Sequence, residues 1–233
     1  MIMDFAFELK DELHRRGASL VGFADLKGIS PEAGMPFGIS IAYALDPNVI
    51  SQISDGPTGE YAALYHRANE ILGKLAEFAA DFIASRGWKA KYIPATTNVS
   101  ADRLATPLPH KTVATRAGLG WIGKCALLVT EQYGSALRLA SVLTEMALPS
   151  GEPVGSSRCG SCDSCVSACP VLAPSGREWN PSLKREEFFD AGLCYKKTSE
   201  NARRPEIGAT ICGICIAACP WTKRYLRSKN RES

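Results

Sequence analysis

Apolar residues in the first part of the chain follow a helical period in two segments. Residues 60–86 give the clearest pattern, because apolar residues recur every three or four positions along one face and Gly87 follows as a stop signal. A second helix is expected near the N-terminus, where apolar residues recur every four positions from Phe5 to Leu13 and Gly17 follows as a cap. The apolar face of the longer helix consists of Leu64, Ala68, Ile71, Leu72, Leu75, Phe78, Phe82 and Ile83.

Short continuous runs of apolar residues, bounded by Gly, Pro and polar residues, predict buried strands around these helices. Residues 110–118 predict a short helix that ends at Gly118, and Gly134 suits a turn between the last two strands. Because helices and strands mix up to residue 148, the pattern predicts an α/β or α+β domain. The predicted strands are residues 19–26, 38–45, 89–95, 125–130 and 135–146.

The pattern changes after residues 148–158, a stretch rich in Pro, Gly and Ser that indicates a domain boundary. Residues 1–150 are therefore predicted to form the α/β domain, which would hold a cofactor or substrate. Residues 151–233 contain few strand signals and most of the cysteines. Short helices and loops around metal are expected there.

Charge and cysteine usage narrow the choice of compartment and partner. The formal net charge of +3 is too small to argue for nucleic acid or an anionic membrane surface. No apolar run approaches the roughly 18 residues that span a bilayer, and the N-terminus lacks the apolar region of a signal peptide. We therefore expect a cytoplasmic protein without membrane association, in which eight of the nine cysteines, all after residue 158, bind metal rather than form disulfides.

The first cysteine motif has the spacing of a bacterial ferredoxin. It reads Cys159-x2-Cys162-x2-Cys165-x3-Cys169-Pro170. In such a run the first three thiolates bind three corners of one [4Fe–4S] cluster, while the fourth binds a different cluster. The motif is therefore incomplete by itself, because its own cluster needs one more ligand and Cys169 needs a second cluster.

A second motif downstream supplies the missing ligands. Cys212-x2-Cys215-x3-Cys219-Pro220 repeats the last part of the first motif, and Cys194 stands alone between the two. Eight thiolates then match the eight irons of two clusters with none left over. We expect one cluster to be bound by Cys159, Cys162, Cys165 and Cys219, and the other by Cys169, Cys194, Cys212 and Cys215.

Two other interpretations of these sequence patterns are less well supported. Zinc also uses C-x2-C pairs, but a run that ends in Cys-Pro and occurs twice is poorly explained by zinc. "GLGWIG" at residues 118–123 formally fits a dinucleotide fingerprint, yet a helix is predicted before it and a strand after it, the reverse of the required order. The ninth cysteine, Cys125, opens an apolar segment and is interpreted as an ordinary buried thiol.

The stretch "HKTVATRAGLGWIGKCALLVTEQYG", with the two cysteine motifs and "CGICIAACPW", resembles the epoxyqueuosine reductase family. More broadly, it is similar to double-[4Fe–4S] proteins related to that family and to corrinoid-dependent reductive dehalogenases, from about residue 17 to 222. The resemblance implies a corrinoid-binding, nitroreductase-like core with a ferredoxin-like module, in which electrons pass through both clusters to cobalamin. Leu128 and Leu139 match positions that approach the corrinoid in the family.

The sequence departs from the family in its proton donor and in its length. The family has a catalytic Asp before "AGLGW", whereas here Asp102 is out of register and His110 occupies a position that is usually acidic. Both residues are candidate proton donors. The chain ends 13 residues after Pro220, without the helical-repeat extension of the tRNA-acting relatives, so nucleic acid is not expected as a partner.

These features predict an iron–sulfur reductase that passes electrons through two clusters to a cofactor, with cobalamin as the candidate, or to a substrate at the N-terminal domain. A ferredoxin or flavodoxin would be the electron donor. The alternative is an accessory electron-transfer protein that donates to a partner, such as a corrinoid protein, without substrate chemistry of its own. In a third interpretation the clusters only stabilise the C-terminal module.

Overall fold

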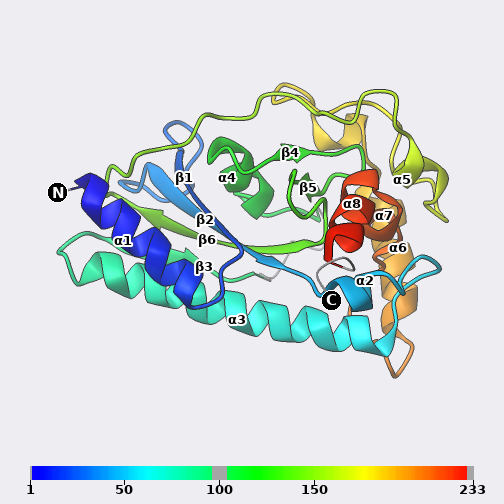
Figure 1. Ribbon diagram of the computed structural model, residues 1–233. Coiled ribbons are helices and arrows are strands. Elements are labelled where there is room, and N and C mark those ends of the chain that lie inside the picture. Colours follow the sequence, from blue (N-terminus) through cyan, green and yellow to red (C-terminus); the bar gives the residue numbers. More distant parts are fainter. Residues whose placement is uncertain (1, 96–103, 230–233) are drawn as a thin grey trace. The chain divides into compact units, whose positions relative to one another are not determined.

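The computed structural model describes residues 2–95 and 104–229 (Figure 1). Helices and strands are mixed in the first part of the chain, and the α-helices of the cysteine-rich part have 4 to 12 residues. In chain order the elements are α1 (Ile2–Arg15), β1 (Leu20–Asp25), β2 (Phe37–Ala44), α2 (Pro47–Ile50), α3 (Gly59–Ala84), β3 (Ala90–Ile93), α4 (His110–Arg116), β4 (Trp121–Ile122), β5 (Leu128–Val129), β6 (Leu137–Thr144), α5 (Ser164–Ser167), the 3₁₀ turn η1 (Arg185–Glu187), α6 (Ala191–Ala202), α7 (Ile214–Ala218) and α8 (Pro220–Lys229).

The chain divides into two compact units, each made of segments that are separate in sequence. We call them the sheet unit and the cysteine unit. The sheet unit comprises Met1–Ala44, Arg67–Leu119 and Arg138–Val154, and the cysteine unit comprises Leu45–His66, Gly120–Leu137 and Gly155–Ser233.

A four-stranded sheet forms the centre of the sheet unit, in the order β1-β2-β6-β3. β1 pairs antiparallel with β2, and β3 pairs antiparallel with β6. Helices α1 and α3 cover one face, where Leu9, Leu72 and Ile41 belong to a single buried cluster. Helix α4 lies against the other face, where Val113 packs with Leu26 and other apolar residues (Figure 1). The mixed α/β prediction is confirmed, with an antiparallel sheet.

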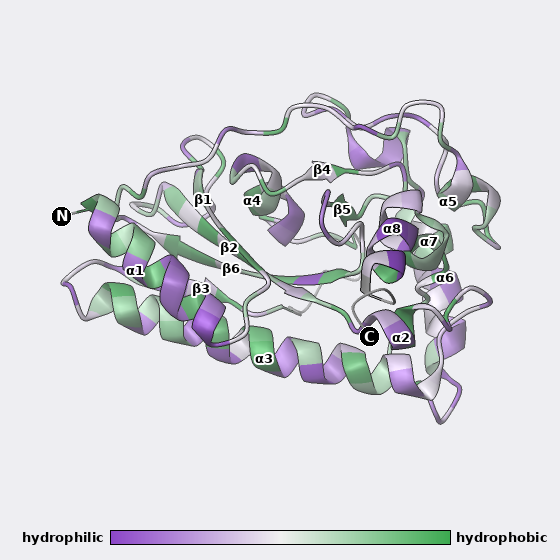
Figure 2. Cartoon of the chain, viewed as in Figure 1, coloured by the Kyte–Doolittle hydropathy of each residue, from purple (hydrophilic) through white to green (hydrophobic). Residues whose placement is uncertain are grey.

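The helical periods read from the sequence are confirmed by the buried faces. Phe5, Leu9 and Leu13 are at most 4% exposed, and α1 stops before Gly17, whose φ of +102° suits glycine. Apolar and polar residues alternate along α3, as Figure 2 shows, and the apolar residues from Leu72 onward enter the core of the sheet unit.

The region around residues 125–146 differs from its prediction in pairing. The predicted strand 125–130 is reduced to β5, which pairs with β4 in a separate two-stranded sheet, whereas β6 belongs to the four-stranded sheet. Gly134 does occupy a turn, with φ of +57°. A Cβ atom there would lie 2.2 Å from the backbone nitrogen of Thr222, so this turn is fitted against α8.

The boundary predicted after residue 150 lies close to the last passage between the units, at Val154 and Gly155. The units nevertheless divide the chain differently, because the cysteine unit also includes two upstream segments. The Tyr225 hydroxyl donates a hydrogen bond to the Leu45 carbonyl at 3.0 Å, and a Cβ at Gly213 would lie 2.5 Å from Ile53 Cδ1. These contacts join distant parts of the chain, which sequence composition does not reveal.

Within the described residues, no helix is both long and apolar enough to cross a membrane.

Candidate metal centre

The β4–β5 hairpin explains the glycines of the segment "GLGWIG". Helix α4 ends before this segment and β4 begins within it, which confirms the predicted order of helix before strand. A Cβ at Gly120 would lie 2.1 Å from the Val129 carbonyl oxygen, and one at Gly123 would lie 2.8 Å from Val129 Cγ2. These two glycines therefore allow close packing within the hairpin and do not mark a nucleotide site.

The turn of this hairpin forms one wall of a cavity of about 80 Å³. This volume exceeds the roughly 10–15 Å³ that a single buried water occupies, so the space can hold a larger group. Four of the predicted ligands reach it from two distant parts of the sequence. The lining residues are Gly123, Lys124, Cys125, Val129, Cys159, Cys162, Cys165, Cys219, Pro220 and Trp221.

The loop that carries the first three cysteines is folded by short-range backbone contacts. The Cys162 amide donates to the Cys159 carbonyl at 3.1 Å, and Gly160 adopts a φ of +55° between them. The Gly160 amide donates to Glu178 Oε1 at 2.6 Å, which fixes the outer side of the loop. Helix α5 then begins and carries Cys165, which is 9% exposed. The x2 spacings thus place three thiols around one space.

Cys219 reaches the same cavity from the start of α8. Burial raises the pKa of its thiol, while the backbone amides of Thr222 and Trp221 oppose this effect. Those amides belong to the first turn of α8, where N–H groups have no partner within the helix. A thiolate at this position therefore has hydrogen-bond donors in place.

A second group of thiols gathers at α6 and the loop before α7. Burial, followed by the neighbouring Cys212 and Cys169 thiols, raises the pKa of Cys194 to about 11. Burial and then Cys169 also raise the pKa of Cys212. Cys169 is not among the residues that line the first cavity. The fourth cysteine of the first motif is therefore grouped with the isolated Cys194 and with the second motif.

Cys125 contacts a member of each motif. The pKa of the Cys125 thiol lies well above its ordinary value. A hydrogen bond with Cys165 lowers this pKa, whereas a hydrogen bond with Cys215 and the burial of the thiol raise it. The side chain is 4% exposed, so its interpretation as a buried thiol is confirmed. Its contacts with two predicted ligands could not be read from the sequence, because no motif includes it.

Within the described part of the chain, no group of three or more Cys, His, Asp and Glu side chains is arranged to hold a single metal ion. The four thiols of the first group instead surround a space larger than one atom. A cubane cluster binds its four thiolates at separate iron corners, so it requires a wider arrangement of ligands than one tetrahedral ion does. The donor set and the cavity therefore fit an iron–sulfur cluster.

Comparison with known proteins agrees with this chemistry. Residues 158–222 match the family of the 4Fe-4S double cluster binding domain. An epoxyqueuosine reductase from Synechococcus sp. (strain CC9605) is 33% identical over 177 residues, which cover 71% of this chain and 49% of the relative. Another, from Gloeobacter violaceus, is 34% identical over 131 residues, 52% of this chain and 38% of that protein.

This chain is an epoxyqueuosine reductase-like protein. A solved epoxyqueuosine reductase with a tRNA-Tyr epoxyqueuosine-modified stem loop aligns with 96% of this chain and 66% of the solved chain, with a TM-score of 0.65 and 21% sequence identity. A catabolic reductive dehalogenase in complex with 3-bromo-4-hydroxybenzoic acid aligns with 92% of this chain and 31% of the solved chain, with a TM-score of 0.70 and 18% sequence identity. At these identities the likeness concerns the fold. The chain spans about half the length, or less, of the curated relatives given above.

The remaining predicted site residues of this reductase-like protein lie in different places. Asp102 falls outside the described residues. Leu128 lies on β5 in the cysteine unit and is 4% exposed. Leu139 lies on β6 in the sheet unit and is partly exposed.

His110 is the first residue of α4, and both of its ring nitrogens have partners. Nε2 lies 2.9 Å from the Pro94 carbonyl oxygen, which can only accept, so Nε2 carries the proton. Nδ1 then accepts from the Ser141 hydroxyl at 2.9 Å. Burial lowers the pKa of His110 to about 4, so the ring is neutral. Its N–H holds the segment after β3, and a role as proton donor stays a prediction.

Proposed function

We propose that this reductase-like protein passes electrons through two [4Fe–4S] clusters to a cofactor or substrate at its N-terminal domain, with cobalamin as the candidate cofactor. The observation that supports it most is the convergence of Cys219 with Cys159, Cys162 and Cys165 on one cavity. When each motif supplies one ligand to the cluster of the other, the two clusters are held in one module. Such a module suits the transfer of electrons between them.

The same geometry supports the crossed assignment of ligands. Cys159, Cys162, Cys165 and Cys219 would hold the first cluster. Cys169, Cys194, Cys212 and Cys215 would hold the second, because the first three of these thiols influence one another and Cys215 follows Cys212 at the C-x2-C spacing. Bound clusters would supply one-electron oxidation and reduction. The protein contributes thiolates and N–H donors at the start of α8.

The cobalamin part of the proposal is supported by resemblance to a reductive dehalogenase whose structure is described as suggesting a mechanism for B12-dependent dehalogenation. Of the two leucines matched to corrinoid contacts, Leu139 is partly exposed and offers an apolar surface that suits a macrocycle. Leu128 is covered within its own unit. Neither side chain provides an atom that could ligate the metal of the corrinoid.

Retention of a corrinoid tests the proposal. The protein is reconstituted anaerobically with iron and sulfide, mixed with hydroxocobalamin and passed through a desalting column. We expect a retained corrinoid spectrum that is shifted from that of the free compound. Leu139→Glu should reduce retention, whereas Ile29→Glu, at a residue that is 37% exposed on the sheet unit, should not.

Loss of corrinoid from the wild-type protein under both oxidising and reducing conditions would contradict the cobalamin part of the proposal. Transfer of electrons from the clusters to a separate corrinoid protein would then favour the accessory role.

A further inference from the structure

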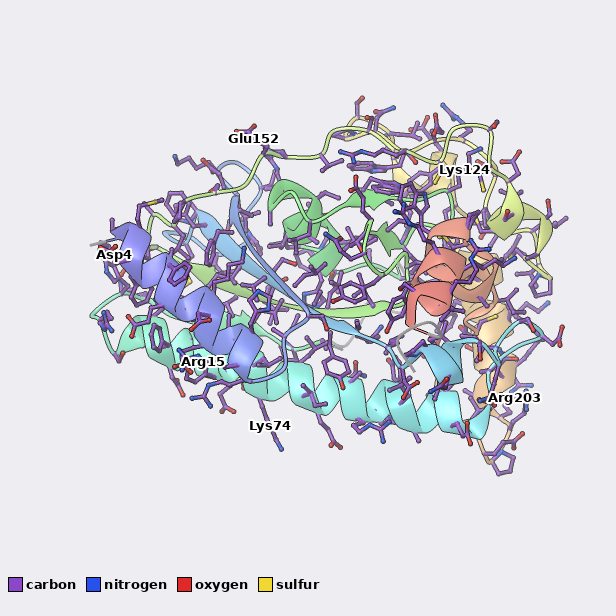
Figure 3. All side chains as sticks on the ribbon, in the orientation of Figure 1. Asp4, Arg15, Lys74, Lys124, Glu152 and Arg203 are labelled. Atoms are coloured by element: carbon purple, nitrogen blue, oxygen red, sulfur yellow. The ribbon has the colours of Figure 1, made fainter. Side chains whose placement is uncertain are left out.

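Lys124, which Figure 3 labels, lies in the turn of the β4–β5 hairpin. It lines the same cavity as the first thiol group. Its side chain is only 5% exposed, although lysine is rarely buried without a partner. The ammonium donates to Asp163 Oδ1 at 2.7 Å, and this hydrogen bond raises the pKa of Lys124. The group is therefore charged at neutral pH.

The ion pair is oriented, because its two ends differ in exposure. Lys124 lines the cavity and interacts electrostatically with Cys159, whereas the Asp163 side chain is 56% exposed. Water screens the carboxylate more strongly than it screens the buried ammonium. A group bound in the cavity would therefore experience a net positive potential from the pair, even though the two formal charges cancel.

Asp163 has no helix-capping role that would explain its position. It is the N-cap residue of α5, yet its side chain caps no backbone amide of that helix. Glu178 also acts electrostatically on Lys124, but its carboxylate accepts from the Gly160 amide. The Asp163 carboxylate instead accepts a hydrogen bond from Lys124.

We propose that Lys124 raises the reduction potential of the cluster bound by Cys159, Cys162, Cys165 and Cys219. This inference rests on the cluster assignment in the proposed function. A cluster bound there would accept one electron from an external donor on reduction and become more negative by one charge, with no bond broken. A fixed cation beside the cavity favours that more negative state, because net charge near a cluster is among the factors that set its potential.

Three variants separate this electrostatic role from a structural one. Lys124→Met keeps an unbranched side chain, one atom shorter, without its charge. Lys124→Arg keeps the charge, and Asp163→Asn removes the outer charge. Each protein is reconstituted anaerobically and assayed for iron, and its clusters are titrated potentiometrically by electron paramagnetic resonance. The second cluster serves as an internal reference in every sample.

Lys124→Met should make reduction of the first cluster at least tenfold less favourable, a fall of about 59 mV for a one-electron couple. Lys124→Arg should remain near the wild type. Asp163→Asn should shift the potential in the opposite direction and by less, because Asp163 is largely exposed. The second cluster should change little in all three.

The inference is overturned if Lys124→Met retains full iron and the wild-type potential, an outcome that leaves the proposed function intact. It is also overturned if Lys124→Met and Asp163→Asn both lose iron at the first site, since the pair would then only hold the loop to the hairpin. Failure of the wild-type protein to assemble two clusters would instead contradict the proposed function itself.

Discussion

Cys219 and Cys169 each lie with the thiols of the other motif, and this arrangement defines the two thiol groups of the chain. Cys219 lines the cavity of the first three cysteines, whereas Cys169 influences Cys194 and Cys212. The spacing x2, x2, x3 followed by proline predicts a crossed assignment of ligands, because the geometry of a cubane determines where each thiolate must point. That assignment stays a prediction, and the grouping of the thiols in the structure agrees with it. The contacts of Cys125 with both motifs were not predictable, since they depend on how the hairpin packs.

At the residue scale, substitution of an exchanged cysteine should damage the cluster of the other motif. Cys219→Ala should remove the signal of the cluster held by Cys159, Cys162 and Cys165, and Cys169→Ala should remove the signal of the other cluster. Low-temperature spectra of the reduced variants distinguish the two.

Cys125→Ala is the matched control, because Cys125 is buried in the same region but completes neither set of four ligands. It should retain the iron content of the wild type. If Cys169→Ala instead lost the cluster of its own motif, the crossed assignment would be wrong.

At the scale of elements, the spacing of apolar residues predicted the longer helices and most strands. The β4–β5 hairpin depends instead on close packing at two glycines. Helices α1 and α3 and strands β1, β2 and β6 formed where apolar residues recur at the appropriate spacing. The short β4–β5 hairpin was missed as a pair, because it depends on Gly120 and Gly123 lying against Val129 rather than on a pattern of hydrophobicity. The hydrogen-bond partners of the His110 ring, on β6 and directly after β3, also depend on packing between segments and were not predicted.

His110 should make the stability of the sheet unit depend on pH. Its pKa of about 4 in the folded protein lies below the ordinary value of 6.5, so the neutral ring stabilises the fold above pH 6.5. This contribution should be lost as the pH falls from 6.5 towards 4. The difference in pKa corresponds to about 3 kcal/mol in the free energy of unfolding.

Thermal unfolding of the wild type and of His110→Asn, followed at several pH values on the anaerobic protein, checks this expectation. The advantage of the wild type should shrink between pH 6.5 and pH 4. An advantage that stays constant over this range would show that the ring does not remain neutral in the folded state.

At the scale of the whole molecule, the chain combines a sheet unit of mixed α/β type with a cysteine unit that carries a double cluster binding domain. Sequence motifs predicted the metal chemistry, because thiolate spacing is local. They did not predict that residues 45–66 and 120–137 join the cysteine unit, since that depends on contacts between segments distant in the chain. The hairpin that carries Lys124 is one of these segments, so the charge beside the first cavity also depends on this arrangement.

The content of iron, acid-labile sulfide and zinc in the anaerobically reconstituted protein tests the central claim most directly. Two crossed [4Fe–4S] clusters require about eight irons and about eight sulfides per chain, with magnetic interaction between the reduced clusters. We predict this composition for the wild type and for Cys125→Ala. Stoichiometric zinc without sulfide, or no more than about four irons per chain, would contradict the account.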